Sequence, residues 1–428
     1  MRVKIAPLIR RNCCRALVLF VLAQTGCSSD KTSLVQPSLL PEADGGAREV
    51  VELHPPNAPS PNATRGASPA QKPQVPGTEA FDVVTVFWGS NRKISQATNA
   101  RVSAEALTSG NSRQLALGFA HVTIPKIGRA AGTIQRPARV GFLNVTLYAG
   151  KEDPRKHFTI GDLQVLDRKT FVGAAELTRL KSRRFKDEAF VFIHGYSTDF
   201  ESALFRTAQL AYDLEFDGVP YVFSWPSRGD ISAYLYDRDA ADSSQRYLRQ
   251  YLELIINETN ATHIHLIAHS MGTRLLVDTV AALAKERGSA GMPKIDQIIL
   301  AAPDIDTQVF EDIAGAITAA AKGVTLYASS NDQALMLSQK AAMGRPRAGE
   351  VTVAGPVIAP GIDSIDITDA GFDEFWSVNH STFAERSHII KDVQLLMLHG
   401  THPPDARFPI YKRLLSSSGS PYWQYVKN

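Results

Sequence analysis

Short apolar runs alternate with helical patterns from residue 189 onwards. The runs have the length of buried strands and lie at 189–193, 219–224, 263–268, 297–302, 324–328 and 362–367. Between several of them, apolar residues recur at helical spacing, first at Ala203, Leu204, Thr207, Ala208, Ala211 and Leu214, and again at Tyr247, Leu248, Leu252, Ile255 and Ile256. Such alternation predicts an α/β fold with a mostly parallel central sheet flanked by helices, over residues 189–400.

The preceding segment, residues 79–188, is rich in strand-like runs. These occur at 82–88, 115–124, 142–148 and 158–166. We therefore expect an N-terminal β-rich extension laid beside the main sheet. The last segment, residues 401–428, mixes polar and aromatic positions, and its pattern predicts no particular element.

The first 27 residues have the pattern of an export signal. Basic residues without acidic ones precede an apolar core of eight residues at 16–23, which is too short for a bilayer span of roughly twenty residues. The segment ends in Gln24-Thr25-Gly26-Cys27 and resembles a bacterial lipoprotein signal, although an aliphatic residue is usual at Gln24. We expect Cys27 to be lipidated, with plain cleavage nearby or an uncleaved anchor as alternatives.

Residues 28–78 are rich in Pro, Ser, Ala and Asn and have little apolar periodicity. This composition predicts a disordered tether, which a membrane-anchored domain needs. The formal net charge of +3 depends on five basic residues before Cys27, and without them the chain carries about −2. Nothing in this balance indicates a nucleic-acid partner.

Cysteines and histidines limit the chemistry of the body. All three cysteines lie in the first 27 residues, so the rest of the chain has neither an internal disulfide nor a thiol nucleophile nor a zinc–cysteine site. His263 and His265 share one face of a predicted strand, but no third ligand is suitably spaced. We expect no metal and no other cofactor.

A serine between small residues follows the run at 263–268. The segment reads Ala268-His-Ser-Met-Gly272 and precedes a helical pattern. A serine at a sharp strand-to-helix turn is typical of a nucleophile elbow, whose flanks must be nearly free of side chains. The turn exposes the hydroxyl of Ser270 above the sheet edge, where the helix N-terminus favours an oxyanion. The alternative is an ordinary serine that caps the helix.

A serine nucleophile needs a base, and the base needs an orienting acid. Asp304, Asp306 and Asp332 each follow a predicted strand. We favour Asp332, which follows the penultimate strand, and keep the other two as alternatives. For the base we favour His380, in a loop-like stretch, over His388, which follows an apparent helix N-cap at Ser387.

The oxyanion needs two backbone N–H donors. We assign one to Met271, directly after the nucleophile, and the other to Tyr196, in the loop after the run at 189–193. Gly195 would let that loop approach the substrate closely. The residues expected around the pocket are His194, Gly195, His269, Trp225 and Arg228, with Tyr236 nearby.

These segments together resemble the α/β-hydrolase superfamily, and within it a bacterial, exported, esterase/lipase-like branch. The resemblance is carried by His194-Gly-Tyr196, Ser224-Trp-Pro-Ser-Arg-Gly229, Ala268-His-Ser-Met-Gly272, Ala302-Pro-Asp-Ile-Asp306, Ser330-Asn-Asp332 and Asn379-His-Ser-Thr-Phe383. It covers roughly residues 189–393. It implies a Ser–Asp–His triad of Ser270, Asp332 and His380, and no metal.

The sequence thus favours a serine hydrolase that cleaves a small-molecule or lipid ester through an acyl-enzyme. We expect it to be exported to a bacterial cell envelope, to face the periplasm, and to contact the membrane through its lipid anchor. Two alternatives remain open. One is a catalytically silent envelope-binding protein on the same fold, and the other is a peptidase or amidase that uses the same triad.

Overall fold

The computed structural model describes residues 80–95, 101–142, 145–288, 295–331, 344–370 and 383–427. All of them belong to one unit, Gln71–Asn428. The predicted signal at 1–27 and almost all of the predicted tether lie outside this unit, and both lie outside the described residues.

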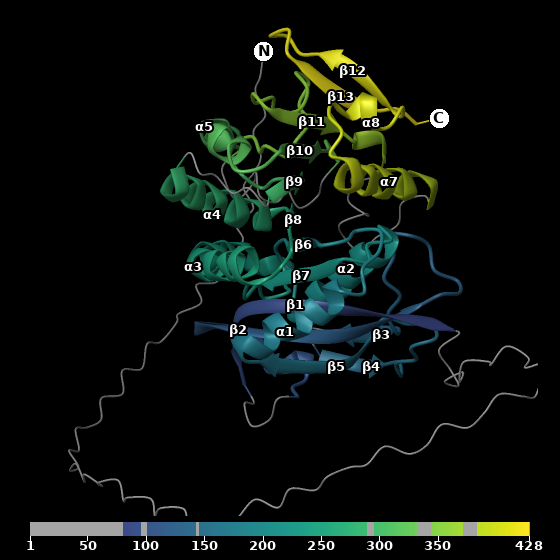
Figure 1. Cartoon of the computed structure of the whole chain (residues 1–428). Helices are drawn as coiled ribbons and strands as arrows, with labels where there is room; N and C mark the ends of the chain where they lie inside the picture. The colour runs from purple at the N-terminus through teal and green to yellow at the C-terminus, as the bar shows by residue number, and fades with distance from the viewer. Residues whose placement is uncertain are drawn as a thin grey trace, which may run out of the picture. The chain divides into compact units, whose positions relative to one another are not determined.

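The described strands form one large sheet and one small hairpin (Figure 1). In chain order they are β1 (Phe81–Ile94), β2 (Leu107–Pro125), β3 (Arg139–Phe142), β4 (Val145–Ala149), β5 (Thr159–Leu166), β6 (Glu188–Ile193), β7 (Val219–Ser224), β8 (His263–His269), β9 (Ile295–Ala301), β10 (Gly323–Ala328), β11 (Ile362–Asp366), β12 (Tyr411–Leu415) and β13 (Pro421–Tyr425). The described helices are α1 (Arg168–Arg179), α2 (Phe200–Asp213), α3 (Tyr234–Glu258), α4 (Met271–Arg287), α5 (Thr307–Thr318), α7 (Phe383–His399) and α8 (Pro404–Arg407), with 3₁₀ turns η1 (Ala104–Ala106), η2 (Ile231–Ala233) and η4 (Thr368–Ala370).

The large sheet has the strand order β12-β13-β11-β10-β9-β8-β6-β7-β1-β2-β5. Every neighbouring pair from β13 across to β1 is parallel. The antiparallel pairs are at the edges, where β2 and β5 follow β1 and where β12 follows β13. The predicted mostly parallel sheet is confirmed, and its strand-rich N-terminal part is continuous with it.

Helices cover both faces of this sheet, because its central strands are apolar on both sides. In β8, Ile264, Leu266 and Ala268 belong to one hydrophobic core, whereas Ile267 belongs to the other. Helices α3, α4 and α5 pack on the first core, and α2 and α7 pack on the second (Figure 1). No helix among the described residues is both long and apolar enough to cross a bilayer.

Three local expectations differ from the structure. The run at 142–148 is not one strand, since β3 and β4 pair antiparallel across it. Ser387 is not a helix N-cap, because α7 begins at Phe383. Residues 411–425, which the sequence left unassigned, form β12 and β13 and extend the sheet next to β11. Short strands at a sheet edge carry little apolar periodicity of their own, so only pairing with a neighbour reveals them.

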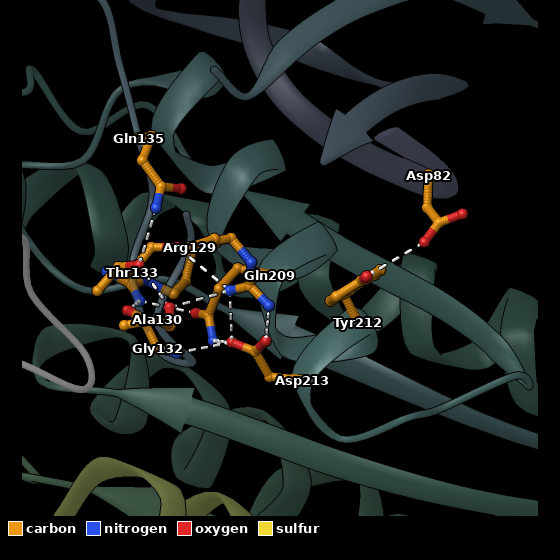
Figure 2. A network of polar contacts seen from close by, with 10 residues as sticks. Asp82, Arg129, Ala130, Gly132, Thr133, Gln135, Gln209, Tyr212 and Asp213 are labelled. Atoms are coloured by element: carbon orange, nitrogen blue, oxygen red, sulfur yellow. Dashed lines mark hydrogen bonds and ion pairs between the residues drawn. The ribbon is translucent and has the colours of Figure 1, made fainter. Parts of the chain in front are cut away.

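A buried polar network attaches the segment after β2 to helix α2 (Figure 2). Asp213 accepts hydrogen bonds from the backbone N–H of Gly132 at 2.7 Å and from Nε2 of Gln209 at 2.6 Å, and it forms an ion pair with Arg129. The side chains of Arg129 and Asp213 are only 7% and 2% exposed. The N-terminal β-rich part is therefore held to the rest of the unit by both β-pairing and buried charge.

Candidate active site

Ser270 lies at the junction of β8 and α4, at the carboxyl edge of the sheet. Its backbone has φ 49° and ψ −124°, a conformation that costs a residue with a Cβ roughly 1–3 kcal/mol. Its side chain makes no capping hydrogen bond to α4, and the residue is 2% exposed. The geometry is that of a strained elbow, and capping does not account for the serine.

The turn needs a residue without a side chain at Gly272. A Cβ at this position would lie 2.2 Å from the carbonyl oxygen of His194 and 2.7 Å from that of Ile193. The start of α4 therefore packs directly against the end of β6. Because of this contact, the elbow and the loop that follows β6 are immediate neighbours.

Residues 194–198 follow β6 and pass beside the elbow, and we call them the oxyanion loop because the sequence predicts an oxyanion donor, Tyr196, among them. A Cβ on Gly195 would lie 3.0 Å from the Cβ of Ser270 and 2.7 Å from Nδ1 of His269. The structure thus brings the two segments that carry the predicted N–H donors, Tyr196 and Met271, to one place. Met271 is the first residue of α4, where a backbone N–H has no acceptor within the helix.

His194, the first residue of the oxyanion loop, and Trp225, which follows β7, are both buried. Their rings stack at 4.9 Å, and Nε1 of Trp225 donates to the carbonyl oxygen of His194 at 2.8 Å. Burial, together with the nearby Arg92 guanidinium, lowers the pKa of His194 to about 3. His194 is therefore neutral at physiological pH and acts as a support for the loop.

His269 and Arg228 have surroundings of different kinds. Burial, together with the Arg206 guanidinium, lowers the pKa of His269 to about 3, so this imidazole beside the nucleophile is also neutral. The guanidinium of Arg228 lies over the ring of Tyr236 at 4.2 Å. Arg228 is exposed and stands at the edge of the site.

The preferred acid and base, Asp332 and His380, lie outside the described residues. The structure does describe the segments of chain that lead towards them. Asn331 ends a described segment that follows β10, and His380 falls between β11 and α7. Strands β8, β9, β10 and β11 are consecutive and parallel, so the segments that follow them leave the sheet at the edge where Ser270 lies.

The alternative acids and base are engaged in contacts of their own. The carboxylate of Asp304 accepts from the hydroxyl of Tyr234 at 2.9 Å and lies 3.3 Å from Nε of Arg347. Asp306 caps helix α5 through the backbone N–H groups of residues 308 and 309. His388 lies on α7, where its Nδ1 is 3.0 Å from the hydroxyl of Tyr425 in β13.

The paired histidines of β8 are bound to carboxylates on neighbouring strands. Nδ1 of His263 is 2.7 Å from Asp296, and Nε2 of His265 is 3.0 Å from Glu188. Among the described residues, no group of three or more His, Cys, Asp or Glu side chains is arranged to hold a metal ion.

A cavity of about 270 Å³ opens next to the elbow. Its lining includes Met271, Tyr234, Ile305, Val309, Asp304, Asp306 and Asp278, and the guanidinium-bearing residues Arg238, Arg274 and Arg347. Apolar side chains and charged groups thus meet beside the residue whose N–H is a predicted oxyanion donor.

Two residues of the site were missed by the sequence reasoning. Arg92 and Asp237 are buried, and each contacts both the oxyanion loop and the segment after β7. The available signal for Arg92 was the polar stretch 89–92 directly after the apolar run at 82–88. Asp237 lies in the first turn of a long helix, where an acidic residue is common for other reasons.

Comparison with solved structures finds distant likenesses. A putative cell surface hydrolase from Lactobacillus plantarum WCFS1 is 13% identical, with a TM-score of 0.32, over 53% of this chain and 96% of that one. The alpha/beta hydrolase domain-containing protein 10 from mouse is also 13% identical, with a TM-score of 0.28, over 50% of this chain and 90% of that one. A search of curated proteins found no match.

One protein family matches more than half of the chain. Its description is "Alpha/beta hydrolase of unknown function (DUF900)", and the match extends over residues 173–398, from within α1 almost to the end of α7. The matched segment contains the elbow, the oxyanion loop and the parallel strands β6 to β11. This chain therefore belongs to the DUF900 family of α/β hydrolases.

Proposed function

We propose that this protein is a serine hydrolase that cleaves carboxylic esters through an acyl-enzyme. Family membership supports hydrolase activity in general. The observation that carries the finer proposal is the conformation of Ser270, which is strained, makes no capping bond and lies against Gly195. A fold maintains such strain at a functional residue only when the surrounding packing imposes it.

In the proposed reaction, His380 accepts the proton of the Ser270 hydroxyl as this oxygen attacks the ester carbonyl carbon. Asp332 orients the imidazole and stabilises its charged form. The tetrahedral oxyanion is bound by the N–H groups of Met271 and Tyr196, each worth about 10²–10³ in turnover. The alcohol then leaves with the proton from His380. Water next attacks the acyl carbon and gives a proton to His380, and the acid is released as the Ser270 oxygen leaves with that proton.

The assignment of acid and base rests on chain order and on exclusion. The order nucleophile, acid, histidine is the order of this fold. Asp332 and His380 come after β10 and β11 in the sequence, and the described segments that follow these strands leave the sheet at the edge that holds Ser270. The capping bonds of Asp306 and the contact of His388 with Tyr425 favour structural roles for these two residues. Asp304 remains the closer alternative, because its N–H donates to the carbonyl of Ser270 at 3.3 Å.

The test is covalent labelling by a fluorophosphonate together with turnover of p-nitrophenyl esters of increasing acyl length. Wild type should form one adduct, and Ser270→Ala should lose both the adduct and turnover. Ser243→Ala is the matched control, since this serine bonds a carbonyl of its own helix at 2.9 Å, and it should behave as wild type. A well-folded wild type without an adduct would favour a silent binding protein, and an adduct without ester turnover would favour an amidase.

We further propose that the protein is exported and held at a bacterial envelope membrane by a lipid on Cys27. The support is the composition of the leader and of the Pro-rich segment that follows it. The mass of the mature N-terminus decides this question. An unmodified terminus away from Cys27 would contradict the proposal.

A further inference from the structure

Strand β1 reaches the carboxyl edge of the sheet and carries a buried arginine there. Ser90 of β1 pairs with Ser224 of β7, and Arg92 follows two residues later with 1% exposure. Its Nε donates to Oγ of Ser224 at 2.9 Å. The two Nη groups donate to the carbonyl oxygens of Ser227 at 2.9 Å and of Thr198 at 2.8 Å. One guanidinium therefore ties the oxyanion loop to the segment after β7.

Asp237, at the start of α3, binds the same two segments and is completely buried. Its carboxylate accepts from the backbone N–H of Ser197 at 2.9 Å and from that of Arg228 at 2.8 Å. It also accepts from the hydroxyl of Ser227 at 2.6 Å, while that hydroxyl accepts from the N–H of Thr198 at 2.9 Å. We call Arg92, Ser227 and Asp237 the loop clamp.

The clamp holds a strained backbone next to the proposed oxyanion donor. Ser197 has φ 54°, in the left-handed region that residues with a Cβ rarely adopt. Its N–H donates to the Asp237 carboxylate, and Tyr196 is its neighbour in the chain. Without the clamp, Ser197 would relax towards an ordinary φ. This would turn the peptide between Tyr196 and Ser197 and, because Tyr196 is joined to it, displace the N–H on the other side of Tyr196.

Charge also favours the arrangement. Burial lowers the pKa of Arg92 to about 10, while Asp199 and Asp237 act in the opposite direction. The side chain is therefore cationic at neutral pH. A buried cation with three oriented donors holds its partners more rigidly than a neutral side chain would.

We propose that Arg92 is a positioning residue that holds the oxyanion loop in its productive geometry, with Asp237 as its counterpart on α3. This inference rests on the proposed function and adds to it. Arg92 lies outside the segment matched by the family, residues 173–398. The N-terminal β-rich part would then belong to the catalytic apparatus and would be required for turnover.

The experiment compares Arg92→Gln and Asp237→Asn with Arg136→Gln. The control removes an arginine of the same N-terminal part whose partners among the described residues, Phe158, Glu201, Glu152 and Phe205, all lie outside the two site loops. Each protein is first titrated with a fluorophosphonate to completion, so that turnover is expressed per competent site. The ester kcat and KM are then measured, together with the affinity for a trifluoromethyl ketone that forms a tetrahedral adduct.

We expect both clamp variants to lose about 10–100-fold in kcat per titrated site, with KM nearly unchanged. The affinity for the ketone should fall by the same factor, and the control should match wild type. A merely structural role would lower the number of titrated sites and leave kcat per site intact, and that result would overturn the proposal. Asp237→Asn, which is nearly isosteric, decides the matter if Arg92→Gln does not fold. A wild type that forms no adduct refutes the proposed function itself, which is a distinct outcome.

Discussion

Replacing Gly272 by alanine tests whether the contact between α4 and β6 sets the geometry of the site. The new Cβ would lie 2.2 Å from the carbonyl oxygen of His194, whereas ordinary contact begins at 3.4 Å. The obstacle is backbone, so no change of rotamer relieves it. The start of α4 and the end of β6 must separate by about 1.2 Å.

This separation acts on stability and on turnover to different extents. Overpacking of this kind costs about 1–3 kcal/mol, and the higher helix propensity of alanine returns up to about 1 kcal/mol. The net loss in the free energy of unfolding should be about 1–2 kcal/mol. Met271 and Tyr196 lie on opposite sides of the widened contact, and a misplacement of about 1 Å costs about 10²-fold in rate. We therefore expect kcat per titrated site to fall about 100-fold.

Gly315→Ala in α5 is the matched control, because a Cβ there meets no atom within 4 Å. It should gain up to about 1 kcal/mol in stability and keep wild-type turnover. Urea denaturation and ester hydrolysis, corrected by fluorophosphonate titration, measure both quantities. If Gly272→Ala were as stable and as active as Gly315→Ala, the reasoning about this contact would be wrong.

Three further predictions concern stability. The pKa of His194 is about 3 in the folded state and 6.5 as a free group, so its contribution to the free energy of unfolding is complete above pH 6.5 and is lost as the pH falls towards 3. Between pH 7 and pH 5 the loss should be about 2 kcal/mol. A His194→Asn protein whose stability fell with the same pH slope would contradict this. Ser270→Gly should be about 1 kcal/mol more stable than Ser270→Ala, since only glycine tolerates the elbow conformation without strain; equal urea midpoints would argue against strain. Asp392 is fully buried and hydrogen-bonded to Arg407 and two tyrosines. Asp392→Ala should therefore lower the free energy of unfolding by about 3–5 kcal/mol. A loss below about 1 kcal/mol in chemical denaturation would show that the cluster is dispensable.

Much of the architecture could be predicted from residue pattern. The apolar runs that became β6 to β11 are continuous because both faces of a parallel sheet are covered, and this leaves a strong local signal. The position of the strand-to-helix turn at Ser270 could also be predicted, since a serine between small residues at such a junction is a local motif. The structure gives the reason for Gly272, because its missing Cβ is what allows α4 to contact the end of β6.

Contacts between distant segments could not be predicted in the same way. Arg92 and Asp237 are 145 positions apart in the chain, and nothing in either local pattern indicates that they share two loops. His194 and Trp225 were predicted near the pocket, and only the structure shows that their side chains are buried and stacked on each other. Strands β12 and β13 likewise have no distinctive periodicity and are defined by pairing with β11.

The sequence by itself determined the parallel α/β sheet, the position of the elbow on it, and the order of the candidate residues. These features depend on local sequence, because strands, turns and small flanking residues are set by residues that are close together in the chain. The tertiary structure alone decided that the N-terminal strands belong to the same sheet and that a buried arginine from β1 braces the loop beside Ser270. The physical reason is that a buried charge must be compensated wherever the fold places its partners, and that placement depends on packing between segments that the chain itself keeps far apart.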